Sequence, residues 1–94
     1  MSLTALLDLT LRSPDGLRVV HDTLAATKAF PGCLGVEVLV DADDAGHVVV
    51  LERWESAERD AAYRAWRRTP EGASSLGTVL ATPARLTKYT TESD

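Results

Sequence analysis

Cysteine is nearly absent from this chain, and its scarcity limits the redox and metal chemistry that the protein can carry. Cys33 is the only cysteine among 94 residues, so no disulfide can form within the chain and no CxxC pair exists. Histidine is scarce as well, and neither His21 nor His47 belongs to a cluster of His, Asp and Glu with metal-ligand spacing. We therefore expect no metal centre, and a buried, inert thiol at Cys33.

Long apolar runs and an excess of basic residues are also missing. The apolar segment 3–11 is too short to span a bilayer and contains Asp8. Lys and Arg number 10 against 14 Asp and Glu, which gives a net charge of −4 and argues against nucleic-acid binding. The cluster of Arg64, Arg67 and Arg68 is interpreted as a solvated helix face. We expect a cytoplasmic protein with neither a nucleic-acid nor a membrane partner.

Two common signatures of cofactor binding and catalysis are absent too. Gly32 and Gly35 flank an expected strand rather than the start of a helix, so they do not form a dinucleotide-binding loop. No serine stands in a nucleophile elbow. Together these absences favour cofactor-free chemistry or plain binding, and we expect no cofactor.

What the chain does contain is the pattern of four strands and two helices within one domain. That domain is expected to cover residues 1–94. Period-two alternation and β-branched residues predict strands over residues 3–11, 33–40, 47–54 and 84–91, with a polar hairpin loop over 41–46. Helical spacing predicts one helix that follows the cap Ser13 and ends near Phe30, another that follows the cap Ser56 and ends near Arg68, and a third, short helix around 76–80. The order β-α-β-β-α-β predicts an α+β, ferredoxin-like fold.

The central strands are apolar on both faces, which predicts a dimer. Val38 and Leu39 should point to opposite sides of the sheet, as should Val49 and Val50. Helices of this fold cover only one face. A second copy, packed sheet against sheet, is the simplest cover for the other face.

Three short segments form a pattern by their order and spacing. Residues 31–38 (PGCLGVEV) form the turn into the second strand, residues 52–56 (ERWES) end the third strand in a tryptophan before a capping serine, and Pro83 precedes a last strand that ends in Tyr89. Together these segments resemble the antibiotic biosynthesis monooxygenase family. The resemblance covers nearly the whole chain. It implies a dimeric α/β barrel, with two sheets face to face, and a pocket between each sheet and its own helices.

Members of that family differ in activity. Some oxidise aromatic phenols, quinols or anthrones without metal or flavin, others degrade haem, and some have no established activity. Many carry a histidine on the second helix, nine residues after the strand-end tryptophan, where this chain has Tyr63. Haem-degrading members need a helix histidine as the iron ligand, so the resemblance favours oxygenation of an aromatic substrate over haem degradation.

Six residues are candidates for such a site. Trp54 and Trp66 are candidate aromatic walls, and Tyr63 is a candidate hydrogen-bond donor to a substrate oxygen. Arg64 or Arg85 would stabilise negative charge if either turned inward, although surface positions are favoured for both. His21, at the edge of the first helix's apolar stripe, is a candidate base. For Trp54, Tyr63 and Trp66 core packing is the competing interpretation, and for His21 it is partial exposure.

These observations lead to one hypothesis and two alternatives. The leading hypothesis is a homodimeric, cofactor-independent monooxygenase that converts an aromatic phenol, quinol or anthrone to a quinone with molecular oxygen. The first alternative is a non-catalytic dimer that binds an aromatic metabolite. The second is haem binding and degradation, with tyrosine as a substitute iron ligand.

Overall fold

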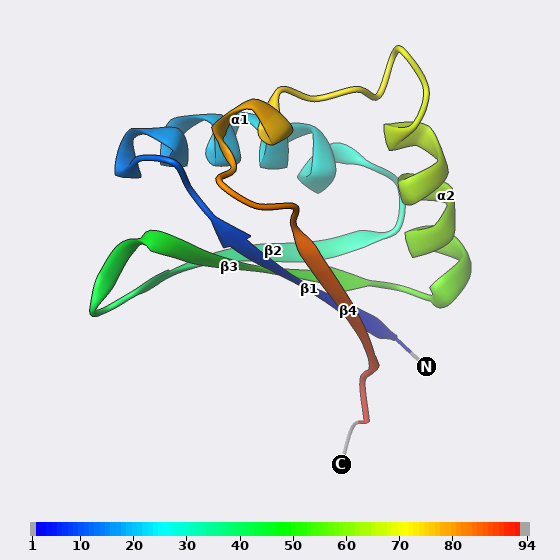
Figure 1. Ribbon diagram of the computed structural model, residues 1–94. Coiled ribbons are helices and arrows are strands. Elements are labelled where there is room, and N and C mark those ends of the chain that lie inside the picture. Colours follow the sequence, from blue (N-terminus) through cyan, green and yellow to red (C-terminus); the bar gives the residue numbers. More distant parts are fainter. Residues whose placement is uncertain (1, 93–94) are drawn as a thin grey trace.

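The predicted β-α-β-β-α-β order is confirmed by the computed structural model, which describes residues 2–92. The elements are β1 (Leu3–Thr10), a 3-10 turn η1 (Pro14–Gly16), α1 (Leu17–Ala29), β2 (Cys33–Asp41), β3 (Asp44–Trp54), α2 (Ala57–Arg67), a 3-10 turn η2 (Leu76–Val79) and β4 (Arg85–Thr90). The strands form one antiparallel sheet in the order β2-β3-β1-β4. Both helices lie on the same side of it, with α1 across the face and α2 at the end where β3 terminates (Figure 1). Within residues 2–92, no helix is long and apolar enough to cross a membrane.

Side-chain caps define where the helical segments begin. The Ser13 side chain accepts a hydrogen bond from the Asp15 amide, but the turn that it caps is η1, and α1 starts only at Leu17. The Ser56 hydroxyl accepts a bond of 3.2 Å from the Arg59 amide and caps α2 as predicted. The third helix is a single 3-10 turn.

The hairpin between β2 and β3 is tighter than the polar composition of residues 41–46 predicted. Asp41 pairs with Asp44 across a two-residue turn, so β3 begins at Asp44 and Gly46 lies inside the strand. The Asp41 carboxylate accepts from the Asp43 amide and the Asp44 carboxylate from the Gly46 amide, each at 2.9 Å. These side-chain bonds replace the longer polar loop that the composition suggested.

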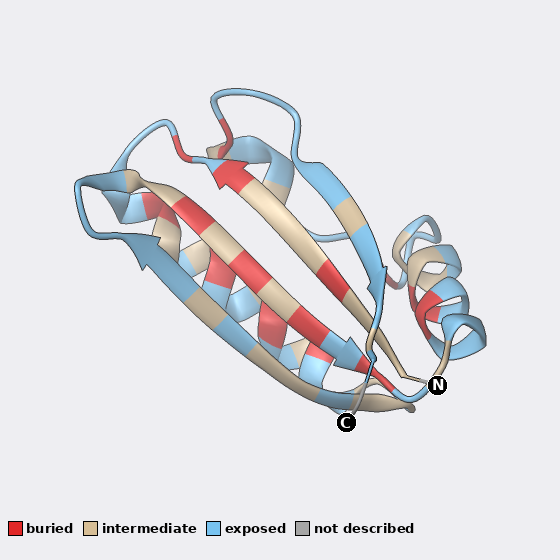
Figure 2. Ribbon diagram, turned by 90° about the horizontal axis from the view of Figure 1, so that it is seen from below, coloured by how far each residue is buried: buried red, intermediate tan, exposed pale blue. Residues whose placement is uncertain are grey.

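The strand register sorts side chains onto two faces of different character. On the face covered by the helices, two buried clusters are separated along the sheet. One contains Leu9, Leu11, Val20, Leu24, Val48, Val50 and Leu80, and the other contains Ala5, Trp54 and Tyr63. Figure 2 looks onto the other face, which no helix covers. Along β3, buried residues that point toward the helices alternate with half-buried or exposed residues that point to this open face.

Candidate functional site

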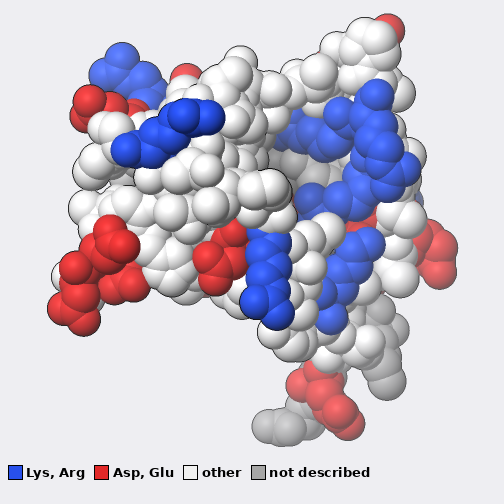
Figure 3. Space-filling view, viewed as in Figure 1, with Lys and Arg blue, Asp and Glu red and all other residues white. Residues whose placement is uncertain are grey.

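A cavity of about 210 Å³ lies between the sheet and the two helices, at the gap between the two core clusters. Its apolar wall comes from β1, β3, α1 and η2 and consists of Leu7, Leu9, Val20, Leu24, Val50 and Leu76. Its polar wall consists of Thr23, Glu52, Tyr63, Arg64, Arg67 and Ser74. Figure 3 shows basic side chains gathered around a hollow beside α2. The cavity therefore combines an apolar wall with charged side chains at one side.

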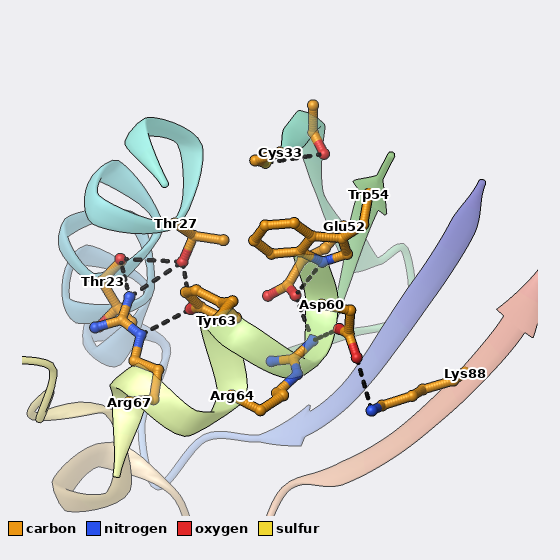
Figure 4. Close-up of polar contacts among 11 residues, drawn as sticks. Thr23, Thr27, Cys33, Glu52, Trp54, Asp60, Tyr63, Arg64, Arg67 and Lys88 are labelled. Atoms are coloured by element: carbon orange, nitrogen blue, oxygen red, sulfur yellow. Dashed lines mark hydrogen bonds and ion pairs between the residues drawn. The ribbon is translucent and has the colours of Figure 1, made fainter. Parts of the chain in front are cut away.

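Glu52 places a buried carboxylate in the wall of this cavity. Its side chain is 1% exposed, and its Oε1 atom accepts hydrogen bonds from Arg64 Nη2 at 2.6 Å and from Trp54 Nε1 at 3.3 Å. Arg64 also lies 3.1 Å from Asp60, whose other oxygen is 2.6 Å from Lys88 Nζ. Figure 4 shows this chain of charges running from β4 through α2 to β3. Each buried charge has an opposite charge beside it, as burial requires.

A second polar network holds the hydroxyl group of Tyr63. Arg67 Nε donates to this oxygen at 2.7 Å, and the Thr27 hydroxyl lies 2.6 Å from it (Figure 4). Arg67 also donates to the carbonyl oxygens of Thr23 at 2.8 Å and Gly72 at 3.1 Å. The guanidinium group thereby ties α2 to α1 and to the segment after α2. The ring of Tyr63 lines the cavity, but its hydroxyl has partners inside the protein.

The structure brings only two of the six predicted site residues to the cavity wall, Tyr63 and Arg64. Trp54 is fully buried behind Tyr63, with ring centroids 4.9 Å apart, so it belongs to the core rather than to the wall. Trp66 stacks on Phe30 and Arg67 and lines a different hollow, between α1 and the segment after α2. The prediction that Trp54 and Trp66 form the aromatic walls of the pocket is therefore wrong for this cavity.

The remaining two candidates lie away from the cavity. His21 is exposed on α1 and does not line the cavity, so its placement gives a role as base no support. Arg85 pairs in register with Asp8, and the alternation of β4 directs it to the face that no helix covers. Arg64 was expected at the surface, and the structure places it in the cavity wall instead. Together with Arg67 it turns inward, and of the predicted solvated helix face only Arg68 is exposed.

Four residues of these two networks were not among the candidates from the sequence: Glu52, Asp60, Thr23 and Thr27. A signal for part of this set exists on α2, where Asp60, Tyr63, Arg64 and Arg67 have the spacing i, i+3, i+4, i+7 that marks one face of a helix. Glu52 offers a weaker signal. It shares the strand alternation of Val48, Val50 and Trp54, which puts it on the same buried face.

Two titratable groups outside the cavity have shifted pKa values. His47, at the hairpin end, contacts Asp41 at 2.8 Å and Asp8 at 2.9 Å, and these hydrogen bonds raise its pKa above 6.5. The same contact with His47, helped by the Asp43 amide, lowers the pKa of Asp41. Burial raises the pKa of the half-buried Cys33 thiol, in agreement with an inert role. Across residues 2–92, no three His, Cys, Asp or Glu side chains are placed to hold a metal ion.

The fold defines a class, the ferredoxin-like α+β proteins, and in this chain a cavity lies between the sheet and its helices. SnoaB, a cofactor-independent oxygenase from Streptomyces nogalater, has this fold with a TM-score of 0.81 at 17% identity, over 99% of this chain and 95% of its own. Rv0793 from Mycobacterium tuberculosis matches with a TM-score of 0.77 at 22% identity, over 100% of this chain and 98% of its own. PA3566 from Pseudomonas aeruginosa matches with a TM-score of 0.75 at 19% identity, over 98% and 95%. No curated protein sequence matches significantly.

The sequence model of one family covers more than half of the chain. The match to the antibiotic biosynthesis monooxygenase family extends over residues 17–73, from the start of α1 to beyond the end of α2. The chain belongs to this family. The matched segment includes β2 and also α1, β3 and α2, and these last three elements supply most of the cavity wall.

Proposed function

We propose that this protein is a monooxygenase that oxidises an electron-rich aromatic phenol, quinol or anthrone to a quinone with molecular oxygen and without a cofactor. The observation that carries the proposal is the cavity, whose apolar wall faces a pair of opposite charges, Glu52 and Arg64. An aromatic ring fits the apolar wall, and the charges suit a ring hydroxyl that gains negative charge during reaction.

The volume of the cavity favours a compact substrate. A cavity of about 150 Å³ holds one benzene ring, and this cavity measures about 210 Å³. Within the proposed class we therefore favour phenols and quinols of one or two rings over larger polycyclic anthrones. A test panel should include all three kinds, because an opening toward solvent allows part of a larger substrate to remain outside.

The proposed reaction balances without an external reductant. The phenol loses its proton, and the resulting phenolate passes one electron to oxygen. The two radicals join through a new carbon–oxygen bond, which gives a hydroperoxide after protonation. Loss of the ring C–H proton and cleavage of the O–O bond then release water and leave a carbonyl, so that one oxygen atom enters the product and one leaves as water. Arg64, which lines the cavity, would stabilise the phenolate.

Oxygen consumption tests this proposal directly. Metal-free protein would be mixed with hydroquinones, naphthols and anthrones, and the oxygen electrode trace compared with that of buffer alone. We expect turnover with at least one compact member of the panel and a quinone product by absorbance. Rates equal to buffer for every compound would refute the proposed activity.

The cavity would also serve a protein that binds an aromatic metabolite without converting it. The two functions separate in one experiment, in which a naphthol is titrated into the protein without oxygen and oxygen is then admitted. Binding followed by no product would favour the binding protein. The Tyr63 hydroxyl, already bonded to Thr27 and Arg67, gives no support to iron ligation.

We further propose that a second copy of the chain covers the open face of the sheet. This face carries Leu6, Leu39, Val49, Leu51 and Tyr89, of which Leu39 is 47% and Tyr89 is 52% exposed. Light scattering after size exclusion should give twice the mass of the 10.1 kDa chain, and Leu51→Asp should give a folded monomer. A wild-type monomer at micromolar concentration would contradict the proposal.

A further inference from the structure

We propose that the Glu52 carboxylate is the base of the site and takes the proton from a bound phenol or from the C–H group of its keto tautomer. This inference rests on the function proposed above. Glu52 lies on β3, at the centre of the sheet, and its side chain is 1% exposed. Among the described residues it is the one carboxylate in the cavity wall.

The hydrogen bonds of Glu52 leave one oxygen available to a ligand. Within residues 2–92, the polar contacts of its carboxylate all go to Oε1, from Arg64 Nη2 at 2.6 Å and Trp54 Nε1 at 3.3 Å. The Oε2 atom has no such bond. Two donors fixed on one oxygen orient the carboxylate, and a rigid central strand carries it, so a base is held in place before the substrate arrives.

The other candidate groups are less suited to this task. The Tyr63 hydroxyl is bonded to Thr27 and Arg67, and His21 is exposed away from the cavity. Asp60 is fully buried but outside the cavity wall, between Arg64 and Lys88. A base must reach the proton that it removes. Of these alternatives only Tyr63 lines the cavity, and its hydroxyl group is already hydrogen-bonded, whereas Glu52 lines the cavity with one carboxylate oxygen left without a hydrogen bond among the described residues.

The proton transfer fits the charges around Glu52. The proton moves to Oε2, and the electron pair of the broken O–H or C–H bond stays on the substrate as a phenolate or enolate. Arg64, which had neutralised the carboxylate, then faces the new negative charge on the substrate oxygen. The protonated carboxyl group is next to the peroxide that forms after oxygen adds, and it returns its proton there. Glu52 is thus a carboxylate again at the end of the cycle.

Proton abstraction can be measured without oxidation. The probe is 2-tetralone, a two-ring ketone, in D₂O without oxygen, and NMR follows the exchange of its α protons for deuterium. We expect wild-type protein to accelerate exchange and Glu52→Gln to lower this acceleration by about 100-fold, the order of magnitude of general-base catalysis. Glu55→Gln, the same change at an exposed position outside the cavity, should leave the rate unaltered.

The variant is designed to keep the fold. Its amide oxygen can still accept from Arg64 and Trp54, which directs the NH₂ group, a donor, into the cavity. If it nevertheless fails to fold, the wild type decides the question alone. Wild-type protein should bind 2-naphthol about 10-fold or more tightly than 2-methoxynaphthalene, because only the naphthol donates a hydrogen bond to the carboxylate.

Failure of this inference and failure of the proposed function give different results. Exchange that depends on Glu52, without oxygen consumption on any substrate, supports the base and refutes the oxygenase. Oxygen consumption with equal exchange rates in wild type and Glu52→Gln refutes the base and keeps the oxygenase. Absence of exchange in the wild type, or equal affinity for the naphthol and its ether, overturns the inference.

Discussion

Tyr63→Phe separates a structural from a catalytic role of the tyrosine hydroxyl. The substitution removes one oxygen atom that Arg67 Nε contacts at 2.7 Å and Thr27 Oγ1 at 2.6 Å. The ring itself stays, with its contacts to Phe30 and Trp54. The expected loss is one of stability, because the hydroxyl group belongs to the hydrogen-bond network between α1 and α2.

The size of the loss follows from what remains bonded. Arg67 keeps its bonds to Thr23, Gly72 and Thr27, so only its Nε–H loses a partner, and Thr27 keeps its contact with Arg67. A buried group without a partner costs about 1–3 kcal/mol. We therefore expect Tyr63→Phe to lower the free energy of unfolding by about 2 kcal/mol, which corresponds to about 8–16 °C in Tm for a domain of this size.

The assay combines unfolding with turnover. Urea and thermal unfolding would be recorded for wild type, Tyr63→Phe and Thr82→Val at one protein concentration, because the proposed dimerisation would make Tm concentration-dependent. Thr82 is exposed and lies outside the sheet, so the loss of its hydroxyl group should change the free energy of unfolding by no more than about 0.5 kcal/mol. Turnover of Tyr63→Phe at a temperature where it is folded should remain within about threefold of wild type. A variant of wild-type stability that has lost most of its turnover would refute the reasoning.

Three further predictions concern stability. Gly72→Ala should destabilise by about 2 kcal/mol or more, because a Cβ there overlaps the Trp66 carbonyl, whereas Gly77→Ala has open space and serves as the control in thermal unfolding. Lys88→Met should lower the free energy of unfolding in urea by about 1–3 kcal/mol, because Arg64 is then the one charged partner left to buried Asp60 among the described residues. Lys28→Met, at an exposed position, is the control and should cost little. Equal effects of the two lysine changes would contradict this account. Asp41→Asn should lower the pKa of His47, which NMR titration would follow, and an unchanged His47 titration would contradict the contact. The contribution of His47 to stability is complete below pH 6.5 and is lost as pH rises through its raised pKa, whereas that of Asp41 is lost as pH falls through its lowered pKa, below 3.8. The stability of the variant should therefore differ most from that of wild type between pH 3.8 and pH 6.5.

The fold could be predicted from the sequence because its strands and helices are marked by short-range patterns of apolar and polar residues. Alternation places Val48 and Val50 on the covered face and Val49 and Leu51 on the other, as the register confirms. The hairpin bounds were wrong for a local reason as well. The Asp41 and Asp44 carboxylates bond to backbone amides inside a tight turn, a geometry that composition alone does not distinguish from a longer polar loop.

The cavity could not be predicted in the same way because its polar residues come together from distant parts of the sequence. The partners of Asp60 are Arg64, one helical turn away, and Lys88 on the last strand. Periodicity assigns a residue to a face but does not say which charges meet there. For Trp54 the sequence left both a cavity wall and core packing open, because an aromatic residue on the covered face suits either, and the structure shows it fully buried in the core.

The inward-facing side chains of α2 fit the proposed function better than they fit a role in stability alone. Its alanines at positions 57, 61, 62 and 65 are exposed, while Asp60, Arg64 and Arg67 turn toward the interior. This reverses the usual arrangement, in which small apolar residues are buried and charges face water. Paired charges in the interior seldom stabilise a protein more than apolar residues of similar volume. Despite this cost, α2 directs its arginines at the cavity that Glu52 lines. This arrangement is expected when binding or chemistry at the cavity, rather than packing, determines which side chains face inward.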